Sequence, residues 1–284
     1  DRKFGIAVSS GSAALDVAVA ALEIGSGDEV ILPTFSIISC SASIFRSGAK
    51  PVLVDCDLNT WNMDVNQIES KITSNTKAIM VVHTYGLPVE MDKIINLANK
   101  HDLFIIEDAA EMHGQYYKDR PCGSFGDIST FSFYPNKHIT TGEGGMIVCN
   151  DPNLAERCRS FRNLCFQNQR RFIHEELGWN YRFTSLQAAL GIAQLERLEK
   201  NIIRKREIGN RYYENLKDNK FLFFQENETE FSKNIYWIFG IVVKEKFHKD
   251  TAFIMDYLKK SGIGSRPFFW PVHKQPVFNK RGLY

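Results

Sequence analysis

The feature that most constrains the fold of this chain is a series of short apolar runs that alternate with helical patterns. Runs of this length, rich in β-branched residues, are typical of buried strands. Strands that alternate with helices predict a three-layer α/β architecture around a mainly parallel sheet. Ligands of such sheets bind beyond the carboxyl ends of the strands. The first five runs cover residues 4–8, 28–34, 51–57, 77–84 and 103–108, and a helical pattern covers 91–101.

The pattern changes near residue 184, where the apolar spacing predicts one long helix over residues 184–202. Beyond this helix the sequence predicts a strand at 236–243, a helix at 249–260 and an extended segment at 266–273. We therefore expect two domains, in line with the length of 284 residues. The large domain is expected to span residues 1–198, and a smaller C-terminal α/β domain residues 199–284.

Charge and cysteine content exclude several classes of protein. The chain has 35 basic and 33 acidic residues and a net charge of +2, so no polybasic surface for nucleic acid is expected. No apolar run approaches the roughly 20 residues that a membrane-spanning helix needs. The six cysteines show no Cys-x-x-Cys spacing and the histidines show no metal-ligand spacing, so we expect neither a metal site nor disulfides. A cytoplasmic enzyme fits these properties.

Lys137 lies in the most informative segment of the chain, residues 131–145. The apolar, aromatic run before it indicates a buried strand. The Thr-Thr-Gly-Glu-Gly-Gly run after it indicates a turn that leads into a strand at 146–148. A lysine at the end of a buried strand, beside glycines that let a ligand approach closely, is suited to forming a Schiff base with an aldehyde. The plain alternative is a solvated loop lysine.

The segment Ser9-Ser-Gly-Ser-Ala-Ala-Leu joins the first strand to a helix. The free amide groups at a helix N-terminus, with the positive end of the helix dipole, bind phosphate. Gly11 would permit the close approach of such a group, and the hydroxyl of Ser12 could add a hydrogen bond. The alternative is an ordinary N-cap, made by Ser10 or Ser12, with no ligand.

Asp108 ends the strand at 103–108 and is followed by small residues. A carboxylate there could pair with a protonated ring nitrogen, which a pyridoxal cofactor needs in order to act as an electron sink. Glu111 lies one helical turn further on and could reach the ring oxygen of the same cofactor. The alternatives are an N-cap for Asp108 and an acid favoured by the helix dipole for Glu111.

Four further polar residues are candidates with equally plain alternatives. Ser132 lies five residues before Lys137, so an ideal strand would point the two side chains to opposite faces unless a turn reorients the chain. Asn180 and Arg182 occupy an aromatic loop before the long helix, where they could bind a phosphate or carboxylate or only cap and pack. His273 could contact a substrate or lie at the surface.

Taken together, these segments resemble the DegT/DnrJ/StrS family of pyridoxal-phosphate-dependent sugar-nucleotide aminotransferases, which have the type I aminotransferase fold. The matching segments run in the family's order and cover essentially the whole chain. They are Ser10-Gly-Ser-Ala-Ala-Leu, Glu107-Asp-Ala-Ala-Glu, Phe131-Ser-Phe-Tyr-Pro-Asn-Lys, Thr140-Thr-Gly-Glu-Gly-Gly, Gly178-Trp-Asn-Tyr-Arg-Phe-Thr and Gln187-Ala-Ala-Leu-Gly.

The resemblance implies a role for each residue that would touch the ring of pyridoxal 5′-phosphate. Lys137 matches the lysine that holds the cofactor as a Schiff base and then moves the proton between substrate carbon and cofactor. Asp108 matches the partner of the pyridinium nitrogen. Glu111 matches the position that contacts the phenolic oxygen, which is often glutamine or histidine in relatives.

The resemblance also implies how the phosphate and the subunits are arranged. Ser12, Ala13 and Ser132 match the family's phosphate contacts. Asn180 matches a residue that serves the active site of the neighbouring subunit, so an obligate homodimer is implied. Arg182 lies in the same segment, with a less defined role.

Within the family, residues 131–145 and 266–273 look most like members that convert GDP-4-keto-6-deoxy-mannose to its 4-amino sugar, with L-glutamate as amino donor. Other members act on dTDP or UDP sugars, or aminate C3. Relatives that are sugar 3-dehydratases have histidine at the lysine position, and His138 follows Lys137 directly. A non-catalytic, regulatory relative is the remaining alternative.

Two departures from the family pattern bear on the site. Where relatives carry an aromatic residue that stacks on the cofactor ring, this chain has Ile37. Either an aliphatic face replaces the stack, or the neighbouring Phe35 supplies it. Relatives also extend beyond both ends of this chain, so we expect a fragment with an incomplete C-terminal domain and an exposed apolar face there.

Overall fold

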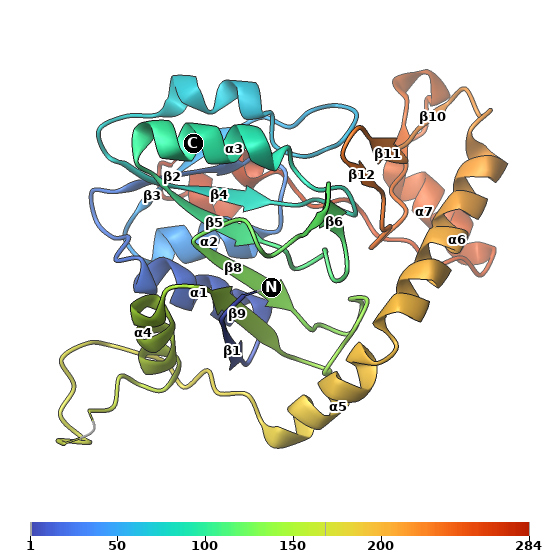
Figure 1. Ribbon diagram of the computed structural model, residues 1–284. Coiled ribbons are helices and arrows are strands. Elements are labelled where there is room, and N and C mark those ends of the chain that lie inside the picture. The colour runs from blue at the N-terminus through green and yellow to red at the C-terminus, as the bar shows by residue number, and fades with distance from the viewer. Residues whose placement is uncertain (1, 168, 284) are drawn as a thin grey trace.

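The computed structural model describes residues 2–167 and 169–283 and contains a seven-stranded sheet between two layers of helices (Figure 1). The strands of the sheet are β1 (Phe4–Val8), β2 (Glu29–Pro33), β3 (Lys50–Val54), β4 (Thr76–Val82), β5 (Phe104–Asp108), β8 (Ile128–Ser132) and β9 (Gly145–Cys149). Their order is β1-β9-β8-β5-β4-β2-β3. Of these, β9 runs against the others, because it pairs antiparallel with both β1 and β8 while the remaining pairs are parallel. The predicted mainly parallel α/β sheet is confirmed.

One face of the sheet is covered by α1 (Gly11–Ala21), α2 (Ile38–Arg46) and α4 (Pro152–Arg162). The helix α1 lies at the centre of this layer, against β8 and β9 and between the other two helices. Most of its residues are buried, which explains why its sequence is apolar on nearly all sides rather than along one stripe. It begins at Ser10, whose Oγ accepts a hydrogen bond of 3.0 Å from the amide of Ala13.

The other face is covered by α3 (Met91–His101) and two short 3₁₀ segments, η1 (Val65–Gln67) and η2 (Glu69–Lys71). Met91, Ile94 and Ala98 of α3 are buried against β4 and β5, at the spacing expected for one face of a helix. Burial of a side chain such as Met91 or Ile94 contributes about 1.5–3 kcal/mol. The helix predicted at 91–101 is confirmed.

The predicted long helix at 184–202 is wrong in its continuity. The structure has two helices there, α5 (Ser185–Leu195) and α6 (Leu198–Leu216), which run along one side of the molecule in Figure 1. At the junction the amide of Arg197 bonds to the carbonyl of Gln194, three residues back, where an uninterrupted α-helix bonds four residues back. No glycine or proline marks this break, so the apolar spacing alone could not reveal it.

The predicted strand at 236–243 is also largely wrong, because only β13 (Val242–Val243) forms. Tyr236 has a φ angle of +50°, and its amide bonds at 2.7 Å to the side chain of Asn234. A local side-chain acceptor of this kind competes with a sheet ladder for the backbone. Residues 235–237 are instead buried against the loop that follows β8, where His138 contacts Ile235 and Asn136 contacts Trp237.

The remaining elements are small. The helix predicted at 249–260 forms as α7 (Thr251–Lys260), with Asp250 as its N-cap. In the described ranges, no helix has the length and apolarity needed to cross a bilayer. The other elements are β6 (Tyr116–Tyr117), β7 (Arg120–Pro121), β10 (Leu222–Phe223), β11 (Glu228–Thr229), β12 (Ser232–Lys233), η3 (Glu245–Phe247), η4 (Val272–Lys274) and α8 (Pro276–Asn279). The division into domains at residues 198 and 199 stays a prediction.

Candidate active site

A cavity of about 350 Å³ lies beyond the carboxyl ends of β4, β5 and β8, next to the N-termini of α1 and α2. This is the place where parallel α/β sheets bind ligands, and the volume is in the range of small-molecule sites. It collects residues that are far apart in the sequence. They are Ser10, Gly11, Ser12, Leu15, Ile37, Ser39, Val82, His83, Thr84, Asp108, Ala110, Glu111, Ser132, Tyr134, Asn136, Lys137, Glu143, Trp237 and Phe269.

Lys137 borders this cavity with its side chain only 9% exposed. Its Nζ lies 3.5 Å from Oε1 of Glu111 and 3.9 Å from the centre of the Trp237 ring. A turn that closes with a 3.0 Å hydrogen bond from the amide of Lys137 to the carbonyl of Tyr134 carries the lysine round the end of β8. The lysine is therefore buried in the cavity, and a solvated loop lysine does not describe it.

Glu111 is buried beside Lys137, and its Oε2 accepts a 2.7 Å hydrogen bond from the amide of Tyr85. Burial raises the pKa of Glu111 to about 7, although Lys137 and the Tyr85 amide both act to lower it. A carboxyl group with such a pKa can hold or release a proton near neutral pH.

Asp108 is buried at the end of β5, and both of its carboxylate oxygens accept hydrogen bonds. Oδ1 accepts from the amide of Ala110 at 3.0 Å, and Oδ2 accepts from Sγ of Cys40 at 3.2 Å. Burial raises the pKa of the Cys40 thiol well above its ordinary value, which keeps this group a donor. These two hydrogen bonds fix the orientation of the carboxylate. Asp108 lines the cavity at the carboxyl end of β5.

The N-terminus of α1 and the end of β8 meet at the cavity. A Cβ atom on Gly11 would lie 2.7 Å from Cβ of Ser132, so only glycine allows this approach. Ser132 and Lys137 border the same cavity, because the turn after β8 reorients the chain as the candidate role required. Ser12 shares a 2.8 Å hydroxyl contact with Ser39 at the start of α2. Two helix N-termini therefore converge here, a favourable arrangement for an anion.

Ala13 occupies a different position from the other predicted phosphate contacts. Its amide donates to Oγ of Ser10, and it is not among the residues that line the cavity. Ser10 is therefore the N-cap of α1, as one of the alternatives predicted. Gly11 and Ser12 line the cavity at the first turn of α1, where backbone amides have no partner within the helix.

The structure separates the two candidates for the face of a bound ring. Ile37 lines the cavity and is 38% exposed. Phe35 packs instead into an aromatic cluster, 5.6 Å from the ring of Tyr85 and 5.8 Å from that of Phe268. The geometry therefore favours an aliphatic face at this position.

Asn180, Arg182 and His273 lie outside the cavity lining. Asn180 and Arg182 are exposed and bond to each other, with 3.2 Å between Nε of Arg182 and Oδ1 of Asn180. His273 is exposed and its Nδ1 lies 2.6 Å from Oγ1 of Thr34. Within one copy of the described chain, these three side chains do not join Lys137.

Sequence reasoning missed His83, which borders the cavity from the end of β4. Its Nδ1 accepts from the amide of Val89 at 3.0 Å, so Nε2 carries the hydrogen and donates to Glu107 at 3.1 Å. Burial acts to raise the pKa of Glu107, but hydrogen bonds from His83 and from the amides of Gly123 and Phe125 hold it at about 2. The position of His83 at a strand's carboxyl end was a signal that could have found it. Trp237 and Phe269 carried no such signal.

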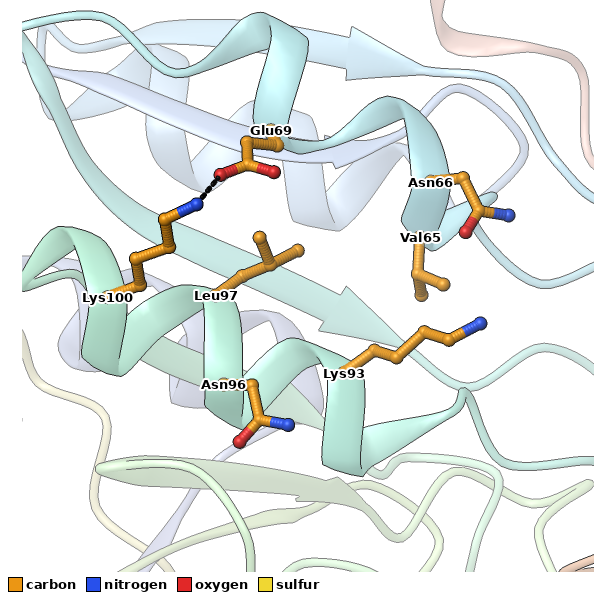
Figure 2. Close-up of a pocket in the computed structure, with 7 residues that line it drawn as sticks. All are labelled: Val65, Asn66, Glu69, Lys93, Asn96, Leu97 and Lys100. Carbon is orange, nitrogen blue, oxygen red and sulfur yellow. Dashed lines mark hydrogen bonds and ion pairs between the residues drawn. The ribbon is translucent and has the colours of Figure 1, made fainter.

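A second cavity of about 340 Å³ lies between α3 and the η1–η2 segment (Figure 2). Two of its lining residues, Lys100 and Glu69, form an ion pair of 2.6 Å. It contains none of the candidate residues. No group of three or more His, Cys, Asp and Glu side chains in residues 2–167 and 169–283 could hold a metal ion. The cavity around Lys137 is therefore the candidate active site.

Comparison with known proteins identifies the class. The solved structure of DesV from S. venezuelae superposes with a TM-score of 0.90 at 31% identity, over 99% of this chain and 74% of that one. GDP-perosamine synthase of Escherichia coli O157:H7 is 43% identical over 279 residues, which are 98% of this chain and 75% of that protein. A dTDP-3-amino-3,6-dideoxy-alpha-D-galactopyranose transaminase of Aneurinibacillus thermoaerophilus is 39% identical over 280 residues, 98% of this chain and 75% of that protein.

These likenesses define a sugar-nucleotide aminotransferase with the type I aminotransferase fold. The model of the DegT/DnrJ/EryC1/StrS aminotransferase family matches residues 1–284, and the chain belongs to this family. The resemblance inferred from the sequence motifs is confirmed.

Aminotransferases of this family depend in general on pyridoxal phosphate, and the cavity suits such a group. It offers one buried amine at Lys137, one oriented carboxylate at Asp108 and one helix N-terminus for a phosphate. Thr84 also borders the cavity, and its buried Oγ1 has no hydrogen-bond partner in the described part of the chain. A buried polar atom of this kind is satisfied when a polar ligand is present.

Proposed function

We propose that this protein binds pyridoxal 5′-phosphate covalently at Lys137 and transfers an amino group from L-glutamate to a 4-keto-6-deoxy sugar nucleotide, in the synthesis of a GDP-perosamine-type 4-amino sugar. The observation that carries the proposal is the single cavity bordered by the amine of Lys137, the carboxylate of Asp108 and the N-terminus of α1. The name of the relative in Escherichia coli O157:H7 supports this substrate class.

The proposed roles follow from the position of each group. When bound, the cofactor would supply an electron sink for the bond that is broken at the substrate carbon. Asp108 would face the pyridine nitrogen and keep it protonated, and Glu111 would lie at the phenolic oxygen. Lys137 would move the proton at the substrate carbon. The phosphate would be held at the α1 N-terminus by Gly11, Ser12 and Ser132, with Ile37 against one face of the ring.

We also propose that the active unit is a homodimer. Asn180 is exposed and does not line the cavity of its own chain, which suits a role in the site of a second copy. The neighbouring helix α5 is apolar although none of its residues is buried, and Leu186 is 86% exposed. An apolar helix that one chain leaves uncovered suits a subunit interface. A cytoplasmic location stays a prediction.

The sugar and nucleotide are proposed on weaker support. Arg182 and His273 would contact the sugar nucleotide, Arg182 together with Asn180 at the edge of the site. The relative in Aneurinibacillus thermoaerophilus is named as a dTDP-3-amino sugar transaminase, so amination at C3 of a dTDP or UDP sugar is the alternative within the family.

A sugar 3-dehydratase that uses histidine in place of the lysine is disfavoured by the position of His138. That residue does not border the cavity, and its Nε2 lies 3.3 Å from the carbonyl of Ile235. Burial lowers the pKa of His138 to about 4, so it is a poor base at neutral pH. These observations support Lys137, and not His138, as the proposed catalytic residue.

Reductive trapping tests the proposal. The protein is loaded with pyridoxal phosphate, reduced with borohydride, digested, and mapped by mass spectrometry. We expect a pyridoxyl adduct on Lys137 and none on Lys205, a half-buried lysine nearby that serves as the internal control. Addition of L-glutamate before reduction is expected to prevent the adduct and to bleach the absorption band of the cofactor bound covalently at Lys137. Folded protein without an adduct on Lys137 refutes the proposed function.

Assays with GDP- and dTDP-linked 4-keto sugars then separate the alternatives. If the proposed substrate is right, turnover is faster with the GDP sugar. NMR of the product then locates the new amino group at C4. An amino group at C3 would reject the perosamine-type assignment while leaving the aminotransferase in place.

A further inference from the structure

Trp237 makes two contacts with the lysine segment. Its ring lies under the amine of Lys137, at 3.9 Å from Nζ to the ring centre, and its indole N–H donates to the carbonyl of Asn136 at 3.0 Å. Trp237 is 6% exposed and comes from a segment that the sequence did not connect with the site. We propose that Trp237 is a positioning residue, which holds the amine of Lys137 in the cavity through its ring face whenever that amine is not covalently bound.

The charges around Lys137 show why the face of the Trp237 ring matters for stabilising its ammonium group. Within hydrogen-bond or ion-pair distance in the described chain, Nζ has one carboxylate, Glu111, at 3.5 Å. Glu111 has a pKa of about 7, so near neutral pH it is a full negative charge only part of the time. An indole face attracts an ammonium group through its quadrupole, and this attraction is stronger where water is excluded. The ring therefore supplies a stabilising contact that does not titrate.

The ring is itself held in place from several directions. The carbonyl of Trp237 accepts a 2.9 Å hydrogen bond from Nζ of Lys205 on α6. The ring packs on Tyr85 at 5.9 Å between centroids and stacks on Phe269 at 6.2 Å. The amide of Tyr85 in turn fixes Glu111. Both neighbours of the Lys137 amine, Trp237 and Glu111, are thus in contact with Tyr85.

The consequence for turnover rests on the proposed function. A lysine that alternates between a covalent bond and release must return to the same place, and a preorganised resting position shortens that return. The indole N–H acts on the backbone next to the lysine, while the ring face acts on the amine itself. These two contacts can be separated by substitution.

Labelling of cofactor-free protein tests the proposal without any enzyme assay. Folded protein is treated briefly with a small acetylating reagent across a series of pH values, and acetylation of Lys137 is quantified by mass spectrometry against the exposed Lys200. The variants are Trp237→Met, which removes ring and N–H but fills much of the space, and Trp237→Phe, which keeps a ring face. Trp61→Phe, in the same aromatic cluster, is the control.

Loss of ammonium stabilisation should raise the acetylation rate of Lys137 in Trp237→Met by about threefold to thirtyfold at neutral pH. The rate at a pH well above the ordinary lysine pKa of about 10.4 should not change. Trp237→Phe is expected to stay closer to the natural protein than to Trp237→Met, and Trp61→Phe to match the natural protein. An equal rise at every pH, which reports only wider access, overturns the proposal. So does a Phe variant that behaves like the Met variant.

Fluorinated tryptophan keeps the test decisive if Trp237→Met does not fold. Incorporation of 5-fluorotryptophan weakens the ring's negative face but keeps its size and N–H. In the described chain, Trp237 is the tryptophan that a lysine or arginine cation contacts face-on. Acetylation of Lys137 should therefore rise at neutral pH while that of Lys200 does not; unchanged labelling contradicts the proposal. Because no cofactor is present, the outcome is independent of the borohydride trapping at Lys137.

Discussion

Glu111 shows how a single residue can couple the cavity to pH. Its pKa in the folded chain is about 7, raised from an ordinary value of 4.5 chiefly by burial. A raised folded-state pKa means that the folded state binds this proton more tightly than the unfolded state does. The stabilising effect is complete below pH 4.5 and is lost as the pH rises through 7. Ionisation of Glu111 therefore weakens the fold across this window.

Glu111→Gln removes this titration and keeps the size and one acceptor of the side chain. The variant should gain stability relative to the natural protein as the pH rises from 5 to 8, by at most about 3 kcal/mol for a shift of this size. Urea unfolding at pH 5 and pH 8 measures the difference. Glu176→Gln, at an exposed position, is the control. A difference between Glu111→Gln and natural protein that is equal at the two pH values would show that Glu111 does not titrate as described.

At the scale of elements, the contact of α1 with β8 sets the depth of the cavity at the N-terminus of α1. The two elements touch at Gly11 and Ser132, where there is no room for a methyl group. The apolar residues of α1 pack against the sheet, α2 and α4. Because such packing is dense, a shift of the helix to relieve a clash would disturb its neighbours. The helix N-terminus is thereby held at a fixed distance from the end of the strand.

Gly11→Ala should push Ser132 aside and disturb both the fold and the cofactor site. Overpacking of this kind costs about 1–3 kcal/mol, and we expect the affinity for pyridoxal phosphate to fall at least several-fold. Urea unfolding and absorbance titration with the cofactor measure the two effects. Gly264→Ala is the control, because a Cβ there meets nothing within 4 Å. If Gly11→Ala matched Gly264→Ala in both measurements, the close approach would have no functional weight.

At the scale of the whole molecule, one copy of the chain leaves the proposed site incomplete. Asn180, predicted to serve the site, is exposed and does not line the cavity, and it lies just before α5, an apolar helix with no buried residue. Both observations are explained if a second copy packs against α5 and presents its own Asn180 to this cavity.

Mixing two inactive variants tests this arrangement. Lys137→Ala and Asn180→Ala are each expected to have little activity as pure proteins. After mild unfolding and refolding together, a mixed dimer contains one site with both an intact lysine and an intact asparagine, provided that Asn180 acts across the interface. Activity should therefore reappear on mixing, in a species with the mass of a dimer by light scattering. No recovery from mixtures that demonstrably exchange subunits would place Asn180 in its own subunit's site or outside it.

The fold was predicted well wherever local pattern decides structure. Short apolar runs bounded by turns formed strands, and α3 and α7 formed where helical spacing indicated them. The prediction failed where a long-range or side-chain contact overrode the pattern. At Tyr236 the side chain of Asn234 and the docking of Trp237 replaced a strand that seven apolar residues had suggested. At Arg197 one shifted hydrogen bond divided a helix whose apolar spacing continues.

The sequence predicted the residues that carry the chemistry of the candidate site, but not all of the side chains that line the cavity. Lys137, Asp108 and the α1 N-terminus belong to strand ends, and the ends of parallel strands meet by the geometry of the sheet. The sequence by itself therefore determined the fold class, the family and these residues. The tertiary structure decided which other side chains share the cavity: Ile37 and not Phe35, and Trp237 across 101 residues of chain. Such contacts depend on how loops and helices pack after the sheet has formed, and local sequence carries no record of that packing.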